Sequence, residues 1–211
     1  MFDTTTRLSF RMRGAFSRDS RSARMQWLRE AVAPHPGLRV VDLGGTPKFW
    51  AGCPVPLDIT IVNLPGASPT PPASTHHTMT LIEGDGCDTG FDDGQFDLAV
   101  SNSVIEHVGD AGRRAALAHE VRRLAPRYWV QTPSIWFPIE AHSLMPGWWF
   151  YPAPLRAWFI RRWRRRLPAW SRMVEETTVL SRREMAALFP DATMHTERRF
   201  GLPKSYVAMR L

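Results

Sequence analysis

Asp42, Gly44 and Gly45 stand at the end of the first strongly apolar segment of the chain, in the string VVDLGGTPKFW. Glycine tolerates positive φ angles and lets a ligand approach the backbone closely. An aspartate at the end of a buried strand could bind an ammonium group of that ligand, or it could hold the loop by hydrogen bonding. A tight turn that binds no ligand is an equally good interpretation of this segment taken alone.

Three further apolar segments also end in small or polar residues. Asn63 ends the second segment 21 residues after Asp42, which is close to the distance at which a nucleoside-binding Rossmann unit presents a side chain to a ribose. The other ends carry Asp85, Gly86 and Cys87 after the third segment, and Ser101 and Asn102 after the fourth. Because ligands of open α/β sheets bind outside the carboxyl ends of the strands, these residues predict one binding site.

Two histidines are candidates for the general base of a reaction at this site. A hydroxyl acceptor is helped by a general base, and the pKa of histidine suits that role. His107 follows the fourth segment in IEHV, and His142 lies in FPIEAHSLMP, close to Glu140. Either could instead be structural, His107 by packing a helix and His142 by anchoring a loop. Proximity and orientation alone could also drive the reaction.

No metal site is predicted from the sequence. Glu106 and His107 are ligand types that suit several divalent ions, but adjacent residues of a helix point in different directions, and two candidates do not complete a site. The two cysteines of the chain form no C-x-x-C pair of the kind that binds zinc. His76 and His77 are expected to be a solvated pair in a loop.

The elements that must position these residues alternate strands with helices, which predicts a parallel sheet with helices on its faces. Asp19 or Ser20 would cap the first helix, and Ser181 with Glu184 forms a capping box at the last. The final two strands, joined by a turn at 201–203, form a C-terminal hairpin. We expect helices at 19–33, 112–124 and 181–188, and strands at 38–43, 57–62, 79–82, 96–100, 127–131, 192–199 and 205–210.

The composition is that of one globular domain, with 211 residues of which 44% are apolar, and it excludes collagen-like, coiled-coil and wholly disordered chains. No apolar run reaches the roughly 18 residues of a membrane span, and the N-terminus has no apolar leader, which predicts a cytoplasmic protein. The net charge of +7 comes from residues 1–30 and 147–172, whereas residues 31–146 are acidic. A nucleic-acid partner is therefore disfavoured.

Taken together, the strings VVDLGG, EGDGCD, FDLAVSNSVIEHV and HEVRRLAPRYWVQTP resemble class I S-adenosylmethionine-dependent methyltransferases. The resemblance covers residues 38–133 and resumes at the last helix and hairpin. SNSVIEHV and TPSIWFPIEAHSLMP are similar to a bacterial subgroup associated with small-molecule or glycan modification. The implied fold is a Rossmann-like, mostly parallel sheet of seven strands with helices on both faces, a C-terminal β-hairpin and a lid-like insertion after the fifth strand. The implied cofactor is S-adenosyl-L-methionine.

The resemblance also implies a role for each residue at the strand ends. Thr46 and Lys48 stand where the family's D-x-G-x-G-x-G run has glycines, and Asn63 replaces the usual carboxylate, whose hydrogen bonds are stronger. A nicotinamide-dependent enzyme fits worse, because residues 44–49 read GGTPKF and not G-x-G-x-x-G. The implied contacts are Asp42, Gly44, Gly45 and Thr46 at the methionine part of the cofactor, Asn63 at the ribose, Asp85 at the adenine amine, Gly86 and Cys87 beside the adenine, and Ser101 and Asn102 near the sulfonium.

Residues 147–172 interrupt the alternation of elements with five tryptophans, seven arginines and no acidic residue. On a helix, most of the arginines would face away from an apolar stripe, a pattern typical of a helix at a membrane interface. The stripe consists of Leu155, Phe159, Trp163 and Leu167. Three interpretations stay open: a lid packed on the sheet over the acceptor pocket, contact with an anionic membrane surface, or binding of nucleic acid or another acidic partner.

The sequence therefore predicts a single methyltransferase domain over residues 1–211. Its activity would be methyl transfer from S-adenosylmethionine to an oxygen or nitrogen atom of a small molecule, sugar or lipid-linked glycan. The alternative is a non-catalytic module of the same fold that binds a membrane surface. The expected parts are an N-terminal helical segment (1–37), a cofactor-binding core (38–131), the insertion (132–172), and the last helix and hairpin (173–211).

Overall fold

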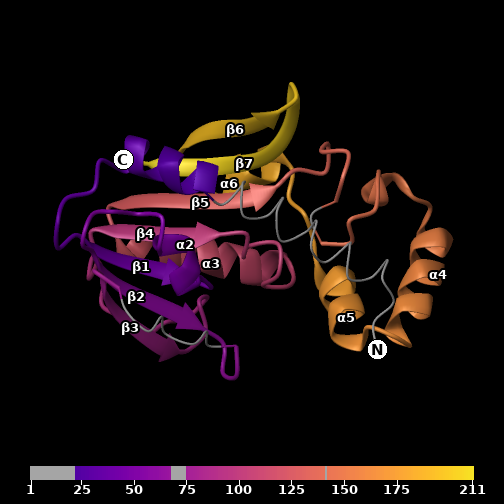
Figure 1. The fold of residues 1–211 in the computed structure, drawn as a ribbon, viewed down its shortest axis with the longest axis horizontal. Coiled ribbons are helices and arrows are strands. Elements are labelled where there is room, and N and C mark those ends of the chain that lie inside the picture. The colour runs from indigo at the N-terminus through magenta and orange to yellow at the C-terminus, as the bar shows by residue number, and fades with distance from the viewer. Residues whose placement is uncertain (1–21, 68–74, 141) are drawn as a thin grey trace.

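A seven-stranded sheet forms the centre of the computed structural model, which describes residues 22–67, 75–140 and 142–211 (Figure 1). The first five strands pair in parallel, and the last pairs antiparallel to its neighbours, in the order β3-β2-β1-β4-β5-β7-β6. This arrangement confirms the predicted mostly parallel sheet with a C-terminal hairpin. The strands are β1 (Arg39–Leu43), β2 (Asp58–Asn63), β3 (Thr78–Glu83), β4 (Leu98–Asn102), β5 (Arg127–Pro133), β6 (Thr193–Arg199) and β7 (Leu202–Arg210).

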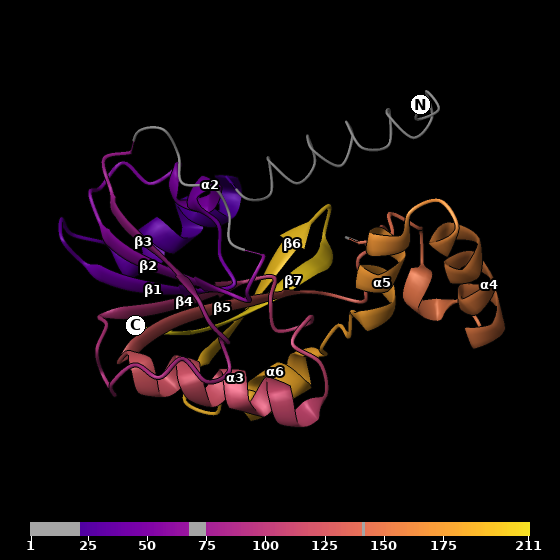
Figure 2. The same ribbon diagram turned by 90° about the horizontal axis from the view of Figure 1, so that it is seen from below.

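Helices cover both faces of the sheet, as Figure 2 shows. On one face lie α3 (Ala111–Leu124) and α6 (Arg182–Leu188), and on the other lie a helical stretch over residues 22–32 and the short α2 (Pro47–Trp50). Neighbouring strand residues enter opposite apolar clusters, Val41 on the first face and Val40 on the second. The sheet is therefore buried on both sides, which is usual for parallel sheets.

Local sequence signals fix several element ends. The Ser181 hydroxyl accepts a hydrogen bond from the Glu184 backbone N–H, and the Glu184 carboxylate accepts one from the Ser181 N–H, so the predicted capping box is confirmed. The Asp110 side chain caps α3 by accepting a backbone N–H of its first turn. The hairpin turns at Phe200 and Gly201, both with positive φ.

The chain between β5 and α6 forms a lobe of short helices beside the sheet (Figures 1 and 2). Its elements are η1 (Trp148–Phe150), α4 (Ala153–Arg164) and α5 (Pro168–Glu176). The rings of Trp148, Phe159, Trp163 and Trp170 pack in series, with centroids between 4.6 and 6.3 Å apart. α4 buries none of its own residues fully. Within the described chain, no helix is both long and apolar enough to traverse a bilayer.

This lobe differs from the predicted stripe and boundary. Phe159 and Trp163 join the aromatic series, but Leu155 is 41% exposed, and Leu167 lies beyond the end of α4. The predicted boundary at residue 172 falls within α5, which continues to Glu176. The structure therefore shows an aromatic lobe whose outer helix, α4, packs on α5.

Other expectations differ at particular residues. The first predicted helix is described from residue 22 to 32, and its proposed caps, Asp19 and Ser20, lie outside the described residues. The strand β7 begins at Leu202, three residues before its predicted start, because a shorter turn joins it to β6. His77, expected in solvent, is only 5% exposed and bonds to backbone groups through both ring nitrogens.

Candidate functional site

The loop after β1 is packed around the carboxylate of Asp42. Trp50 Nε1 donates a hydrogen bond of 2.7 Å to Asp42 Oδ2, and both residues are fully buried. A Cβ atom on Gly45 would lie 1.7 Å from that oxygen, so only glycine lets the backbone pass. Gly44 has a φ of +77°, and a Cβ atom there would lie 2.6 Å from Val104. Both glycines are therefore required by the packing of the loop itself.

The environment of Asp42 bears on its two predicted roles. Burial raises its pKa to about 7 from an ordinary 3.8, and the hydrogen bond from Trp50 offsets only part of this shift. The other carboxylate oxygen, Oδ1, is buried and accepts no hydrogen bond from the part of the chain that the structure describes. The geometry thus supports the role in which Asp42 fixes the loop.

Asn63 connects the end of β2 to the same loop. Its Nδ2 donates a hydrogen bond of 3.0 Å to the Gly45 carbonyl, which leaves Oδ1 as an acceptor. Its backbone carbonyl accepts a bond of 2.8 Å from the N–H of Gly84, beyond β3. Thr46, the next residue of the loop, is exposed and makes no side-chain cap to α2. The predicted ribose residue and the glycine loop are therefore neighbours in space.

Asp85 lies beyond β3, where Arg113 of α3 holds its carboxylate. Arg113 Nη2 lies 2.7 Å from both carboxylate oxygens, and the Cys87 N–H donates to Oδ1 at 2.9 Å. Burial favours a higher pKa for Asp85, but these contacts hold that pKa below its usual value. The Cys87 thiol is buried, which raises its pKa to about 11. Gly86 lies between these two residues, half-buried.

Ser101 and Asn102 end β4 in different environments. Ser101 is fully buried, and its hydroxyl donates to the Leu43 carbonyl at 3.1 Å, which ties β4 to β1. Asn102 Oδ1 accepts a hydrogen bond of 3.1 Å from Arg24 Nη1, and Arg24 also pairs with Glu197 of β6. Ser101 thus stabilises the carboxyl edge of the sheet from inside the core, whereas Asn102 is hydrogen-bonded to the helical stretch that covers the sheet.

The two predicted bases meet beyond the ends of β4 and β5. His107 Nε2 and His142 Nε2 lie 3.0 Å apart. Behind them, His142 Nδ1 lies 2.7 Å from Glu140 Oε1, and His107 Nδ1 lies 3.3 Å from the Thr177 hydroxyl. The structure therefore brings both histidines into one pair, and each ring is oriented by a partner on its far side.

Buried carboxylates flank this histidine pair. Glu106 is fully buried, accepts a hydrogen bond of 3.1 Å from the Thr132 hydroxyl, and has its pKa raised to about 7 by burial. Burial also favours a high pKa for Glu140, but the hydrogen bond and charge of His142 hold it below the usual value. Burial lowers the pKa of His107 to about 4. His107 alone is therefore a weak base near neutral pH.

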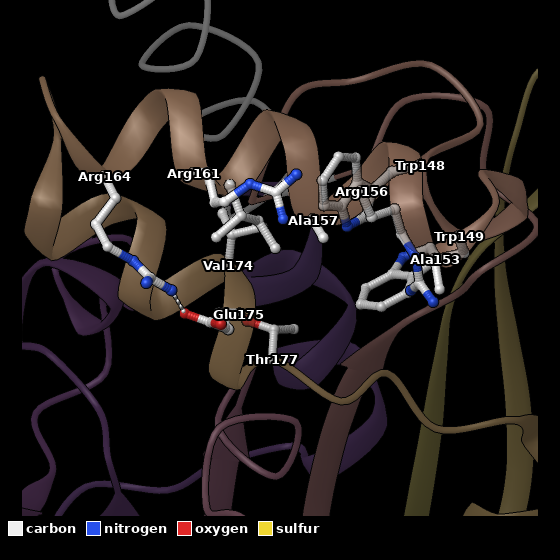
Figure 3. A pocket seen from close by; sticks show the side chains of 11 residues that line it. Trp148, Trp149, Ala153, Arg156, Ala157, Arg161, Arg164, Val174, Glu175 and Thr177 are labelled. Carbon is white, nitrogen blue, oxygen red and sulfur yellow. Dashed lines mark hydrogen bonds and ion pairs between the residues drawn. The ribbon is translucent and has the colours of Figure 1, made fainter.

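A cavity of about 480 Å³ opens between α4 and α5, and Figure 3 shows the side chains that line it. Arg164 pairs with Glu175 across it at 2.7 Å. Arg156, also on its wall, has a buried Nε atom without a hydrogen-bond partner in the described residues. Thr177 lines the same cavity and contacts His107. The cavity thus has guanidinium groups and tryptophans on its walls, and it lies one residue, Thr177, away from His107.

The sequence analysis missed several side chains that hold the site together. Trp50 lies behind Asp42, Arg113 binds Asp85, and Thr177 orients His107. None of these partners belongs to a recognised motif, and two of them meet their targets only through tertiary structure. Trp50 had a local signal, because it ends the one-turn helix that follows the glycine loop.

Residues 59–127 match the family model of a methyltransferase domain. The matched span runs from β2 through α3 to the first residue of β5, and it contains Asn63, Asp85 and His107. A comparison of the sequence with curated proteins gave no significant match.

Many solved structures share the fold. Magnesium protoporphyrin IX methyltransferase from Synechocystis PCC 6803 with bound SAM aligns with a TM-score of 0.54 at 15% identity, over 100% of this chain and 86% of that one. A protein from Pyrococcus horikoshii OT3 aligns with a TM-score of 0.55 at 15% identity, over 87% of this chain and 85% of that one. Phosphoethanolamine N-methyltransferase 2 from Haemonchus contortus, in complex with S-adenosyl-L-methionine, aligns with a TM-score of 0.53 at 13% identity. The alignment covers 83% of this chain but 38% of that longer one.

Proposed function

We propose that this chain, which has the fold of the class I S-adenosylmethionine-dependent methyltransferases, transfers a methyl group from S-adenosylmethionine to an oxygen or nitrogen atom of an acceptor. The matched methyltransferase domain and the shared fold support an enzyme of this kind. One observation carries the proposal: the glycine loop, Asn63 and Asp85 converge at the carboxyl edge of the sheet. That edge is where open α/β sheets bind their ligands.

The residues at this edge fit such a cofactor. We assign the backbone at Gly44 to its methionine part, Asn63 to the ribose hydroxyls and Asp85 to the adenine amine. Asn63 retains a carbonyl acceptor, and the Asp85 carboxylate has lone pairs beyond those that its ion pair uses. Asp42 and Ser101 act from behind by holding the loop and the strand ends. The bound cofactor supplies an electrophilic methyl group on a sulfonium.

The class of acceptor is proposed from the cavity between α4 and α5. Its guanidinium groups, with Arg156 Nε unpartnered in the described chain, favour an acceptor that carries a phosphate or carboxylate. Its tryptophans suit stacking on a ring. A small molecule, sugar or lipid-linked glycan with an anionic group has both features. Because Thr177 joins this cavity to His107, we propose that His107 and His142 position and activate the acceptor.

Calorimetric titration with S-adenosylhomocysteine tests the cofactor site. Gly44→Val should nearly abolish binding, because the added side chain meets Val104 in the loop. Gly90→Val is the matched control, since Gly90 also has a positive φ but open space around it. Asp85→Ala should weaken binding by roughly 1–3 kcal/mol, whereas the exposed Asp88→Ala should not. Wild-type protein that releases no heat would refute the proposal.

The lobe also has features of a membrane-contacting surface, and we propose peripheral contact with anionic lipid as a second property. Trp158 and Phe150 are 49% and 59% exposed, and aromatic side chains beside arginines favour a lipid interface. Co-sedimentation with anionic vesicles should fall on substitution of three exposed arginines by Gln, but not on substitution of a charge-matched triple elsewhere. The test triple is Arg162, Arg165 and Arg166, and the control triple, outside the lobe, is Arg182, Arg183 and Arg198.

The outcomes of the two assays separate the alternatives. Recovery that is equal with neutral and anionic vesicles, or absent with both, would refute the membrane contact. Binding to vesicles without any binding of S-adenosylhomocysteine would instead favour the non-catalytic module. Binding of S-adenosylhomocysteine together with vesicle binding is the expected result.

A further inference from the structure

We propose that Glu106, His107 and His142 bind a divalent transition-metal ion. One carboxylate oxygen and one ring nitrogen of each histidine lie within 4.8 Å of one another. Imidazole nitrogens and a carboxylate are ligands of divalent first-row metals, and two histidines with one carboxylate form a known iron-type set. The three residues come from the turn after β4 and the loop after β5, so the fold itself brings them together.

The spacing of the two imidazoles supports a shared ion. At a metal–nitrogen distance of about 2.1 Å, the two Nε2 atoms 3.0 Å apart subtend about 90° at the ion. A tetrahedral ion would separate them by about 3.4 Å at the same bond length. Because the side chains would adjust around an ion, the distance fits either geometry, and an octahedral ion such as Mn²⁺, Fe²⁺ or Co²⁺ would keep three positions for other ligands.

Outer partners already fix each proposed ligand in a metal-binding orientation. Glu140 bonds His142 Nδ1, and the Thr177 hydroxyl contacts His107 Nδ1, so both rings direct Nε2 toward the shared point. Histidines that bind metals usually donate their other ring N–H to a carboxylate or carbonyl, which fixes the orientation of the ring. The Thr132 hydroxyl likewise occupies only one oxygen of Glu106, Oε2.

An unpartnered atom is the second, independent indication of a ligand. Glu106 is fully buried, and its Oε1 accepts no hydrogen bond from the described part of the chain. A buried carboxylate oxygen without a partner is costly. A cation held between this oxygen and the two Nε2 atoms would remove that cost. The two Nε2 atoms lie within hydrogen-bond distance of each other, so the proposed ion would take the place of that contact and would give the orphaned oxygen a partner.

The sequence argument against a metal assumed that Glu106 and His107 lie on a helix. In the structure they lie in a turn, where the His107 N–H donates to the Val104 carbonyl at 2.7 Å. Adjacent residues of this turn can therefore reach one point. His142 supplies the third ligand from 35 residues further along the chain, which sequence spacing could not indicate.

The role of the ion rests on the proposed function. The coordination positions that these three residues leave free would receive an oxygen or nitrogen of the acceptor and orient it for methyl transfer. The ion would then replace the histidines as the group that contacts the acceptor. Metal binding itself is tested without any assay of activity.

Titration of the chelator-treated full chain with CoCl₂ and MnCl₂ tests the site. We expect one ion per chain by calorimetry, visible d–d absorption on Co²⁺ binding, and loss of the free Mn²⁺ signal in electron paramagnetic resonance. His142→Ala and Glu106→Gln should weaken binding by at least about 100-fold, and Glu140→Gln by about 10- to 100-fold. His119→Ala, at an exposed position on α3, is the control and should bind as wild type does.

Substoichiometric binding, or affinities in His142→Ala equal to those of the wild type, would overturn the proposal. If Glu106→Gln does not fold by circular dichroism, Glu140→Gln still decides, because it changes only an outer partner. A parallel titration with S-adenosylhomocysteine keeps the two proposals apart. Cofactor binding without metal binding refutes the metal site alone, and metal binding without cofactor binding refutes the methyltransferase assignment.

Discussion

The free energy of unfolding of Asp42→Asn, minus that of the wild type, should be larger at pH 8 than at pH 5. The folded chain holds the pKa of Asp42 at about 7, against an ordinary 3.8. Between these values the unfolded chain has lost a proton that the folded chain keeps. The free energy of unfolding of the wild type therefore falls as the pH rises through this window, and it becomes constant above the folded-state pKa.

The magnitude follows from the width of that window. Each pKa unit corresponds to about 1.4 kcal/mol, and the part of the window between pH 5 and pH 7 gives about 2–3 kcal/mol. Asparagine stays neutral throughout, and its carbonyl oxygen can still accept the hydrogen bond from Trp50. The stability difference between Asp42→Asn and wild type should therefore shift by about 2–3 kcal/mol in favour of the variant.

Urea unfolding followed by circular dichroism at several pH values measures this difference. Comparing variant with wild type cancels the contribution of other buried groups, among them Glu106. Asp88→Asn, at an exposed position, is the control, and its difference should stay within about 0.5 kcal/mol at every pH. A difference for Asp42→Asn that does not change with pH would show that the carboxylate is ionised in the fold, and would refute the reasoning.

Three smaller changes test other contacts. Ser181→Ala should cost about 1 kcal/mol of stability by removing the capping box, seen as a lower urea midpoint with the same slope; an unchanged midpoint would contradict the cap. Gly45→Ala should destabilise by more than about 2 kcal/mol, because its Cβ would lie 1.7 Å from Asp42, and a normal midpoint would show that the loop relaxes. Arg113→Met should let the pKa of Asp85 rise toward its ordinary value, measured by NMR titration, and a pKa that stays low would mean that other donors hold it.

The order and type of the elements could be predicted because apolar strands and helical spacing alternate along the chain. The capping box at Ser181 was visible for the same reason, since all of its atoms belong to four consecutive residues. Strand ends were predicted less well, as with β7, because turn length depends on backbone angles at Phe200 and Gly201. Local signals therefore located the elements but not their exact limits.

The contents of the site depended on tertiary contacts that spacing does not encode. His107 and His142 were both named as candidates, but nothing in their spacing indicated that their rings would meet at 3.0 Å. Asp85 was placed at the correct edge, while its ion pair with Arg113 crosses 28 residues. The sequence argument about a metal assumed a helix at Glu106, and the structure has a turn there.

The contact between Thr177 and His107 limits how this protein can be recombined with its structural relatives. The sheet with its covering helices contributes His107, while the chain around the lobe contributes His142 and the hydroxyl of Thr177. A chimaera that exchanges the lobe as a self-contained module would remove the partners of a core residue. A chimaera that retains the contact must therefore have its junctions before Glu140 and after Thr177. The whole stretch between them has to be exchanged together with the turn that follows β4.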